Sequence, residues 1–265
     1  MTYDHLLLER RGHVGIVTLN RPDSLNAMNH GLQEDTRAVC AEIERDDDLR
    51  VMVLTGAGRG FCAGADLSGD ERPDRGAPAQ GERLEPYRWI GLQALAVFRM
   101  TKPTIAAVNG VAVGAGFSLA LACDLRVGHP GTRFKVMFAE RALSPDSGTS
   151  WFLPRIAGYS RTMDLFATNR DLTGEEAYRI GVLDRLVPQE QVLDSAIEVA
   201  EQMASLPPLA IRSGKRTIQW NLAQDLEAAL RNESMGLDYA RKAPNDAAES
   251  RASWLEKRPG VFTGT

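Results

Sequence analysis

The segment PTIAAVNGVAVGAGFSLALACDLRV, residues 103–127, holds the elements that decide the fold. It opens with PTIAAVNG, an apolar run between a proline and a glycine, which predicts a buried strand. The following GAGFSLALACD begins at glycines and predicts a helix, and DLRVGH, residues 124–129, predicts a further short strand. A strand, a helix and a strand in this order indicate an α/β core.

The sequence before this segment continues the alternation of strands and helices. HVGIVTLNRP, residues 13–22, is rich in β-branched residues and ends at a proline, which predicts a strand. RVMVLTGAG, residues 50–58, is a continuous apolar run that predicts a strand buried on both faces. Residues 29–45 and 84–100 have helical apolar spacing. Between them, residues 68–86 are rich in Pro, Gly and charge and predict a long mobile loop.

After the central segment, TRFKVM, residues 132–137, is a short strand candidate, and beyond Trp151 we expect helices only. One helix is centred on residues 226–239. Another is indicated by an apolar stripe made of Val192, Leu193, Ala196, Ile197, Ala200 and Met203. We therefore expect an α/β core over residues 1–200, followed by a helical C-terminal region over residues 201–265.

The composition excludes several classes of protein. The chain has 265 residues, is 43% hydrophobic and 25% charged, and carries a net charge of −4, which leaves no basic surface for nucleic acid. No apolar run is long enough to cross a membrane. Its first residues, MTYDHLLLERRG, are charged where a signal peptide would be apolar. These features predict a cytoplasmic protein with neither a nucleic-acid nor a membrane partner.

The usual metal and redox patterns are missing from the sequence. Cys40, Cys62 and Cys123 have no CxxC spacing, so they predict neither a zinc site nor a disulfide framework, and we expect small buried side chains. The histidines show no metal-ligand spacing either, and we expect them in solvated loops. They are His5, His13, His30 and His129.

Three common catalytic or nucleotide-binding motifs also fail. VGAGFSLAL begins like a dinucleotide-binding loop, but its third glycine position is occupied by Leu119. GAGRGFCAGAD lacks the Gly-Lys-Ser/Thr of a phosphate-binding loop, and there is no GxSxG motif. Two small-residue turns, CAGAD and VGAGF, remain as sites where a ligand could approach the backbone closely. Their amides would form an oxyanion hole if they met, although sequence spacing does not show that they meet.

The stretch ALSPDSGTSWFLPRIAG, residues 142–158, adds one carboxylate, Asp146, just before an apolar helical run. Pro-Asp is common in turns, so Asp146 is either an ordinary turn residue or the acid-base group of an active site. The residues alone leave both interpretations open.

Five stretches together resemble the enoyl-CoA hydratase/isomerase (crotonase) superfamily from about Tyr3 to the C-terminus. They are TLNRPDSLNAMN, DDLRVMVLTGAGRGFCAGADL, KPTIAAVNGVAVGAGFSLALACDLRV, LTGEEAYRIGVLDRLVP and WLEKRPGVFTG. The resemblance implies a spiral of ββα units with a helical C-terminal region. It also implies homotrimers, or hexamers made of two trimers.

The resemblance further implies an acyl-CoA thioester as substrate, with no cofactor beyond its coenzyme A moiety. The amides of Ala65 and Ala115 are implied to hold the thioester oxygen. Positions implied to contact coenzyme A in the same chain are Ser24, Leu25, Ala63, Asp66 and Leu67. Lys257 and Phe262 resemble residues that reach a coenzyme A bound to an adjacent subunit.

The departures from the family pattern concern the reacting groups. Hydratases of the family use two glutamates, and their positions hold Ser118 and Phe138 here. Glu140 is two residues away from the second position, and we expect a solvated charge there. SPDSGTSWFLPRIAG instead resembles the double-bond and ring-modifying isomerases of the family, 1,2-epoxyphenylacetyl-CoA isomerases among them, in which an aspartate at the position of Asp146 is the acid-base residue.

We therefore expect an isomerase in which Asp146 moves a proton along the acyl chain through an enolate. A 2-enoyl-CoA hydratase is the nearest alternative. A thioester dehalogenase matches less well, because that group has Trp and Asn where this chain has Phe138 and Pro145. A non-catalytic acyl-CoA-binding protein is an alternative of another class. Trp89, Phe138 and Trp151 are interpreted either as walls of an acyl pocket or as core.

Overall fold

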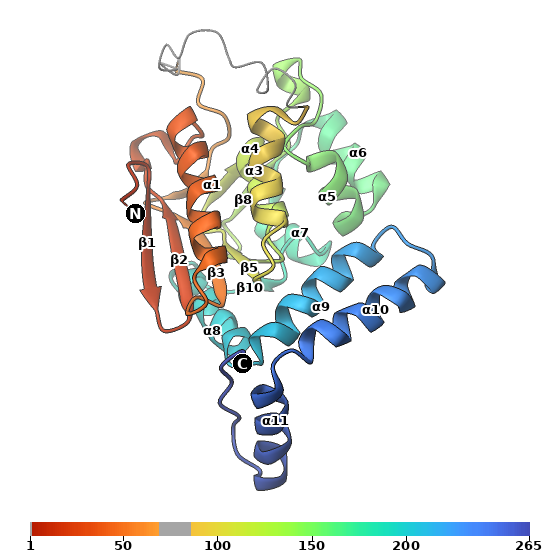
Figure 1. Cartoon of the computed structure of the whole chain (residues 1–265). Helices are drawn as coiled ribbons and strands as arrows, with labels where there is room; N and C mark the ends of the chain where they lie inside the picture. The colour runs from red at the N-terminus through yellow and green to blue at the C-terminus, as the bar shows by residue number, and fades with distance from the viewer. Residues whose placement is uncertain (1, 69–85) are drawn as a thin grey trace.

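The computed structural model describes residues 2–68 and 86–265, with the backbone alone for residues 88–90. The loop predicted between residues 68 and 86 lies outside these ranges except at its two ends, and so does the side chain of Trp89. The described residues form two sheets with helices on both sides (Figure 1). The predicted α/β fold class is confirmed.

The larger sheet of the described chain has six strands in the order β1-β2-β3-β5-β7-β10. β1 and β2 are antiparallel, and every other neighbouring pair is parallel. Their bounds are β1 (Leu6–Arg11), β2 (Val14–Leu19), β3 (Val51–Gly56), β5 (Thr104–Ala107), β7 (Leu125–Gly128) and β10 (Arg185–Leu186). All six residues of β3 are buried, as its continuous apolar run predicts.

The smaller sheet has the order β4-β6-β8-β9 among the described residues. Its strands are β4 (Gly60–Cys62), β6 (Val111–Val113), β8 (Arg133–Lys135) and β9 (Leu172–Thr173). Consecutive strands alternate between the sheets, since β3, β5 and β7 lie in the larger one and β4, β6 and β8 in the smaller one. A helix follows each such pair, so each ββα unit makes one turn of a spiral.

The helices take their order from this spiral. They are η1 (Pro22–Ser24), α1 (His30–Arg45), α3 (Arg88–Phe98), α4 (Ala115–Ala122), η2 (Ala139–Arg141), α5 (Thr149–Ala157), α6 (Tyr159–Thr168), α7 (Gly174–Arg179), η3 (Gln189–Gln191), α8 (Val192–Ala204), α9 (Pro208–Asn221), α10 (Leu226–Ala240) and α11 (Pro244–Glu256). α1 begins where its sequence predicts, because the Asn29 side chain accepts a hydrogen bond from the Leu32 amide at 2.9 Å. None of the helices in the described ranges has the length and apolar character to cross a membrane.

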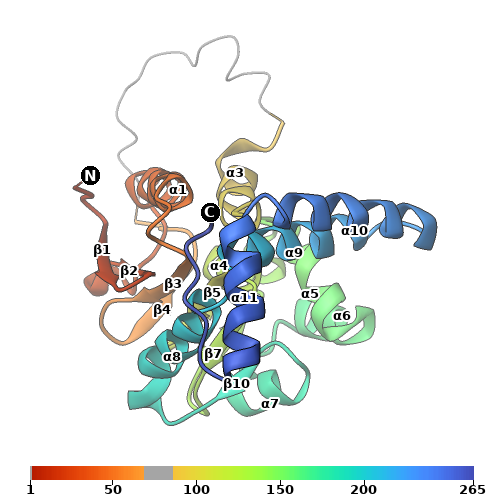
Figure 2. The same ribbon diagram turned by 60° about the horizontal axis from the view of Figure 1, so that its bottom comes forward.

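Alternate residues of the parallel strands face two separate cores. Val51, Val53 and Ile105 point toward α8, which covers one face of the larger sheet (Figure 2). Met52 and Leu54 point the other way, into the core shared with α1, α3 and α4. The apolar stripe predicted on α8 is buried except at Met203, which is partly buried, and Leu193, whose side chain is exposed.

Two sequence predictions are wrong, and one strand was not predicted. The chain is not purely helical after Trp151, because β9 and β10 each add a two-residue strand to the edge of a sheet. β1 was not predicted, because the N-terminal sequence is charged, and it pairs along its whole length with β2. His129 is not solvated: it is 6% exposed, and its ring nitrogens bond the Asn109 carbonyl and the Gly131 amide. The three cysteines are buried, as expected.

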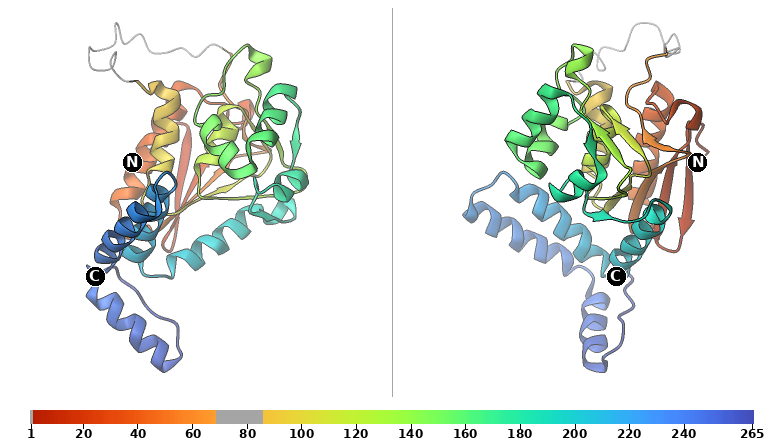
Figure 3. Two further views of the ribbon diagram at one scale, coloured as in Figure 1. Left: turned by 90° about the vertical axis from the view of Figure 1, so that its right-hand side faces the viewer. Right: turned by 180° about the vertical axis from the view of Figure 1, so that it is seen from behind.

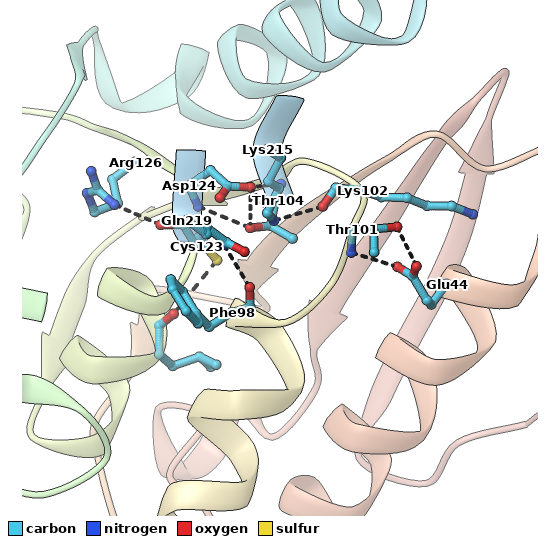
Figure 4. Close-up of polar contacts among 11 residues, drawn as sticks. Glu44, Phe98, Thr101, Lys102, Thr104, Cys123, Asp124, Arg126, Lys215 and Gln219 are labelled. Atoms are coloured by element: carbon cyan, nitrogen blue, oxygen red, sulfur yellow. Dashed lines mark hydrogen bonds and ion pairs between the residues drawn. The ribbon is translucent and has the colours of Figure 1, made fainter. Parts of the chain in front are cut away.

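α9 is fixed to the core through partly buried polar contacts (Figure 4). Lys215 Nζ donates to Asp124 Oδ2 at 2.6 Å and to the Lys102 carbonyl at 2.9 Å. Gln219 Nε2 donates to the Phe98 carbonyl at 2.9 Å. Beyond α9, the chain packs α10 along it and then extends α11 away from the sheets (Figures 1 and 3). The domain boundary expected at residue 200 stays a prediction.

Candidate active site

The CAGAD turn leaves the β4 strand and passes beside Met28. The Met28 amide donates to the Gly64 carbonyl at 2.7 Å, and the Asp66 amide donates to the Met28 carbonyl at 3.0 Å. Successive backbone groups of an extended chain face opposite sides, so the amide of Ala65, between these two, faces away from Met28. It donates no hydrogen bond to any part of the chain that the structure describes. Ala65 is exposed, so its N–H is available to a ligand.

The VGAGF turn leaves β6 and begins α4. Gly114 has φ +50° and donates its amide to the Lys135 carbonyl at 2.9 Å, which turns the chain into the helix at Ala115. Amides in the first turn of a helix have no acceptor within the helix. Ala115 is the first residue of α4, and its amide has no acceptor within residues 2–68 and 86–265. A helix N-terminus also favours negative charge.

The two turns meet in the structure. Gly64 has φ +94°, and a Cβ built on it would lie 2.8 Å from the Val113 carbonyl oxygen and 3.8 Å from the Ala115 nitrogen. A Cβ on Gly116 would lie 2.2 Å from the Cys62 carbonyl oxygen. Only glycine permits these approaches, so both glycines are required to bring the turns together. The two turns therefore pack against each other, and the meeting of the Ala65 and Ala115 amides at one oxygen stays a prediction.

The coenzyme A positions expected within one chain lie next to the CAGAD turn. The Ala63 amide donates to the Leu25 carbonyl at 3.0 Å, which joins the η1 segment with Ser24 to this turn. Asp66 is held by Ser68 and by Arg21, whose Nη2 lies 2.8 Å from Oδ2. Hydrogen bonds from Ser68, together with Arg21, lower the pKa of Asp66 to about 2. Leu67 is exposed and presents an apolar surface beside this charged pair.

The two C-terminal positions are not brought to this cluster within one chain. The Phe262 carbonyl accepts a hydrogen bond from Arg50 Nη2 at 2.7 Å, and the Arg50 amide donates to the His13 carbonyl at 2.8 Å. His13 precedes β2 and Ser24 follows it, so Phe262 lies at the opposite end of that strand from Ser24. Lys257 ends α11 in a left-handed conformation, with φ +54°. Their assignment to a neighbouring subunit stays a prediction.

Asp146 lies in the segment between η2 and α5. Its carbonyl accepts the Thr149 amide at 2.9 Å, and its Oδ1 accepts the Ser147 hydroxyl at 2.8 Å. The side chain is half-buried, and burial raises the pKa of this carboxyl above its ordinary value, while the Ser147 hydrogen bond opposes the rise. Such a group is a stronger base than a solvated aspartate once it is ionised.

A contact between two hydroxyls links this segment to α4, the helix that begins at the VGAGF turn. Ser118, one turn into α4, forms a short hydrogen bond with Thr149, the first residue of α5, and both side chains are buried. The Ser118 amide in turn donates to the Gly114 carbonyl at 3.0 Å. The helix that begins at Ala115 therefore contacts Thr149, and Thr149 fixes the backbone carbonyl of Asp146.

The two positions at which the resemblance implies glutamates in hydratases hold no acid here, and Glu140 is the acid nearest to them in the sequence. Phe138 is 5% exposed and belongs to the core. Glu140 is exposed and paired with Lys135 at 2.9 Å, and Lys135 lowers its pKa, which confirms a solvated charge. Trp151 is partly exposed and packs edge-on against Phe98, with centroids 5.2 Å apart, so it is not core.

Sequence reasoning missed three residues of this region. Met137 has φ +65°, and its Cβ lies 4.0 Å from where a Gly114 Cβ would be, beside the Ala115 amide. Ser147 and Arg21 contact Asp146 and Asp66, respectively. Left-handed backbone at Met or Ser has no signature in composition or periodicity, and the partners are fixed only by the tertiary fold.

Comparison with known proteins identifies the family of this chain. The family model described as enoyl-CoA hydratase/isomerase matches residues 9–265. A 1,2-epoxyphenylacetyl-CoA isomerase of Escherichia coli (strain K12) is 36% identical over 250 residues, which cover 94% of each chain. A probable enoyl-CoA hydratase of Mycobacterium tuberculosis (strain ATCC 25618 / H37Rv) is 36% identical over 257 residues, or 96% of this chain and 90% of that protein.

Solved structures are similar over almost the whole chain. A probable enoyl-CoA hydratase/isomerase from Mycobacterium abscessus superposes with a TM-score of 0.88 at 36% identity and covers 98% of each chain. An enoyl-CoA hydratase from Bacillus anthracis gives a TM-score of 0.89 at 30% identity, covering 99% of this chain and 100% of that one. The chain belongs to the enoyl-CoA hydratase/isomerase family and has the crotonase fold.

The Ser118–Thr149 contact generates a prediction about stability. We expect Ser118→Ala to lower the free energy of unfolding by about 1–3 kcal/mol, because it leaves the buried Thr149 hydroxyl without its partner. Thr149→Val should cost less, because the Ser118 hydroxyl still donates to the Gly114 carbonyl at 3.1 Å. The double variant removes both groups, and we expect it to cost less than the sum of the single changes. Urea unfolding measures all four proteins, and strictly additive losses would contradict the contact.

Proposed function

We propose that this member of the family is an acyl-CoA thioester isomerase. It shifts a double bond, or opens or rearranges an epoxide ring, through an enolate held by the Ala65 and Ala115 amides, with Asp146 as the acid-base group. The observation that carries the proposal is the placement of Asp146. Its side chain is half-buried, and its backbone carbonyl is joined through Thr149 and Ser118 to the helix that presents the Ala115 amide.

The mechanism needs one base and two fixed donors. Asp146 takes a proton from the carbon next to the thioester, and the electron pair of the broken C–H bond moves onto the thioester oxygen. The Ala65 and Ala115 amides stabilise that oxygen, and the loss of one such donor elsewhere costs roughly 2.7–4 kcal/mol. Protonated Asp146 then returns the proton to a different carbon. Nothing is added or lost, so one carboxylate serves first as base and then as acid.

The hydratase alternative is supported by the names of several relatives but not by the residues of this site. Controlled addition of water uses one group to activate the water and another to deliver a proton. The two positions where the resemblance places those acids hold Ser118, which is bonded to Thr149, and Phe138, which is buried. These contacts favour the isomerase.

Homotrimers, or dimers of trimers, complete the proposal. The C-terminal helices expose large apolar side chains, including Leu226, Leu230, Met235, Trp254 and Leu255. Large exposed apolar surface marks interaction sites, and a second copy of the chain would also carry Lys257 and Phe262 to a neighbour's coenzyme A.

We expect sedimentation equilibrium to give the mass of three or six chains, and the mass of one chain alone would contradict this assembly. The cytoplasmic location stays a prediction.

The central test is an Asp146→Asn variant assayed with a 3-enoyl-CoA. We expect ultraviolet absorbance to rise with the native protein, because the 2-enoyl product is conjugated with its thioester. The variant has no proton acceptor, so we expect its rate to fall by about 10²–10⁴-fold. Glu140→Gln is the matched control, since Glu140 is an exposed acid paired with Lys135, and we expect it to keep the native rate.

Two results would contradict the proposed function. Isomerisation by Asp146→Asn at the native rate would remove the aspartate from the mechanism. If neither protein isomerises a 3-enoyl-CoA but both hydrate a 2-enoyl-CoA, the chain is a hydratase and Glu140 becomes the acid to test.

A further inference from the structure

The side chain of Ser147 is committed to Asp146. Its hydroxyl donates to Asp146 Oδ1 at 2.8 Å, and Ser147 itself is 7% exposed. Oδ2 of Asp146 accepts no hydrogen bond from the residues that the structure describes. The two carboxylate oxygens are therefore inequivalent before any substrate binds.

The conformation of Ser147 indicates that this contact is specific. Ser147 has φ +52°, in the left-handed region that disfavours any residue with a Cβ, and Gly148 follows with φ +85°. A glycine at position 147 would relieve the strain, so the backbone conformation alone would favour glycine there.

An ordinary role in starting the helix does not account for the hydroxyl. A serine near a helix start usually accepts a hydrogen bond from an amide of the first turn. Here the residue that precedes α5 is Gly148, no side chain caps that helix, and the Ser147 hydroxyl donates to the carboxylate instead.

Charged groups on the neighbouring elements are engaged elsewhere. Lys135 pairs with Glu140, and Arg155 of α5 lies over the Trp151 ring, 4.1 Å from its centroid. Arg141 of η2 is exposed. Burial and the Ser147 hydrogen bond are the two influences on the pKa of Asp146, and within the described ranges no charged side chain adds to them.

We propose that Ser147 is a positioning residue that fixes the Asp146 carboxylate, so that Oδ2 is the oxygen that exchanges the proton with the substrate. The inference rests on the proposed function and deepens it. In the forward step a substrate C–H bond breaks, an Oδ2–H bond forms, and the electron pair moves to the thioester oxygen. In the return step the Oδ2–H bond breaks as the new C–H bond forms. Oδ1 keeps its hydrogen bond from Ser147 throughout.

The test is the pH dependence of kcat/KM for a 3-enoyl-CoA in three proteins, the native chain and two variants. Ser147→Gly removes the hydroxyl and relieves the strained φ, and Ser147→Ala removes it and keeps the Cβ. The hydrogen bond favours ionised Asp146, whose activity is present above its pKa and lost as pH falls through it. We expect the acid limb of both variants to move upward by about one pH unit.

The outcomes separate this inference from the proposed function. A purely structural role would change the yield of folded protein or the melting temperature, and it would leave the acid limb in place. If the Gly and Ala variants keep the native limb while Asp146→Asn is inactive, Ser147 has no positioning role and the proposed function stands. If Asp146→Asn isomerises the substrate at the native rate, both are overturned.

Discussion

Two chain segments meet at Gly64 and Gly116, where the backbones approach more closely than any side chain would allow. A Cβ at Gly116 would lie 2.2 Å from the Cys62 carbonyl oxygen, and one at Gly64 would lie 2.8 Å from that of Val113. The contact sets the distance between β4 and the start of α4, and it brings the Ala65 and Ala115 amides into one region. Every chemical role proposed for the site depends on this approach.

The spiral explains why these segments are neighbours. β4 and β6 are parallel partners in the smaller sheet, and each ends directly before one of the two turns. Ligands of parallel sheets bind beyond the carboxyl ends of the strands, and both turns lie there. The next unit of the spiral adds β8, and the chain beyond it carries Asp146, whose backbone is held by Thr149 at the start of α5. The strand order thus brings the two turns together, and Thr149 and Ser118 link the backbone of Asp146 to α4.

Much of the fold could be predicted, and the reason differs between elements. The continuous apolar run at 50–58 gives β3 directly, and Asn29 marks the start of α1. β9 and β10 could not be predicted, because two residues carry no periodicity and pair only when the rest of the sheet exists. The sequence predicted a solvated His129 beside a Pro-Gly turn, but the His129 ring accepts a hydrogen bond from the Gly131 amide of that turn.

The same limit applies to the candidate site. The glycine-rich turns and Asp146 were visible in the sequence, whereas the packing of the two turns, the Ser118–Thr149 contact and the hydroxyl of Ser147 on Asp146 are tertiary. The left-handed backbone at Met137 and Ser147 has no signature in residue type. The sequence therefore identifies the candidate site residues, and only the tertiary structure determines their hydrogen-bond partners.

The claim that the Ala65 and Ala115 amides hold one oxygen is tested most directly on the thioester carbonyl itself. The measurement is the infrared stretching frequency of a saturated acyl-CoA labelled with carbon-13 at that carbonyl, free and bound to the protein. Two hydrogen bonds polarise the carbonyl, so we expect the bound frequency to be lower than the free one. A bound ligand whose carbonyl frequency equals that of the free thioester would contradict the shared site.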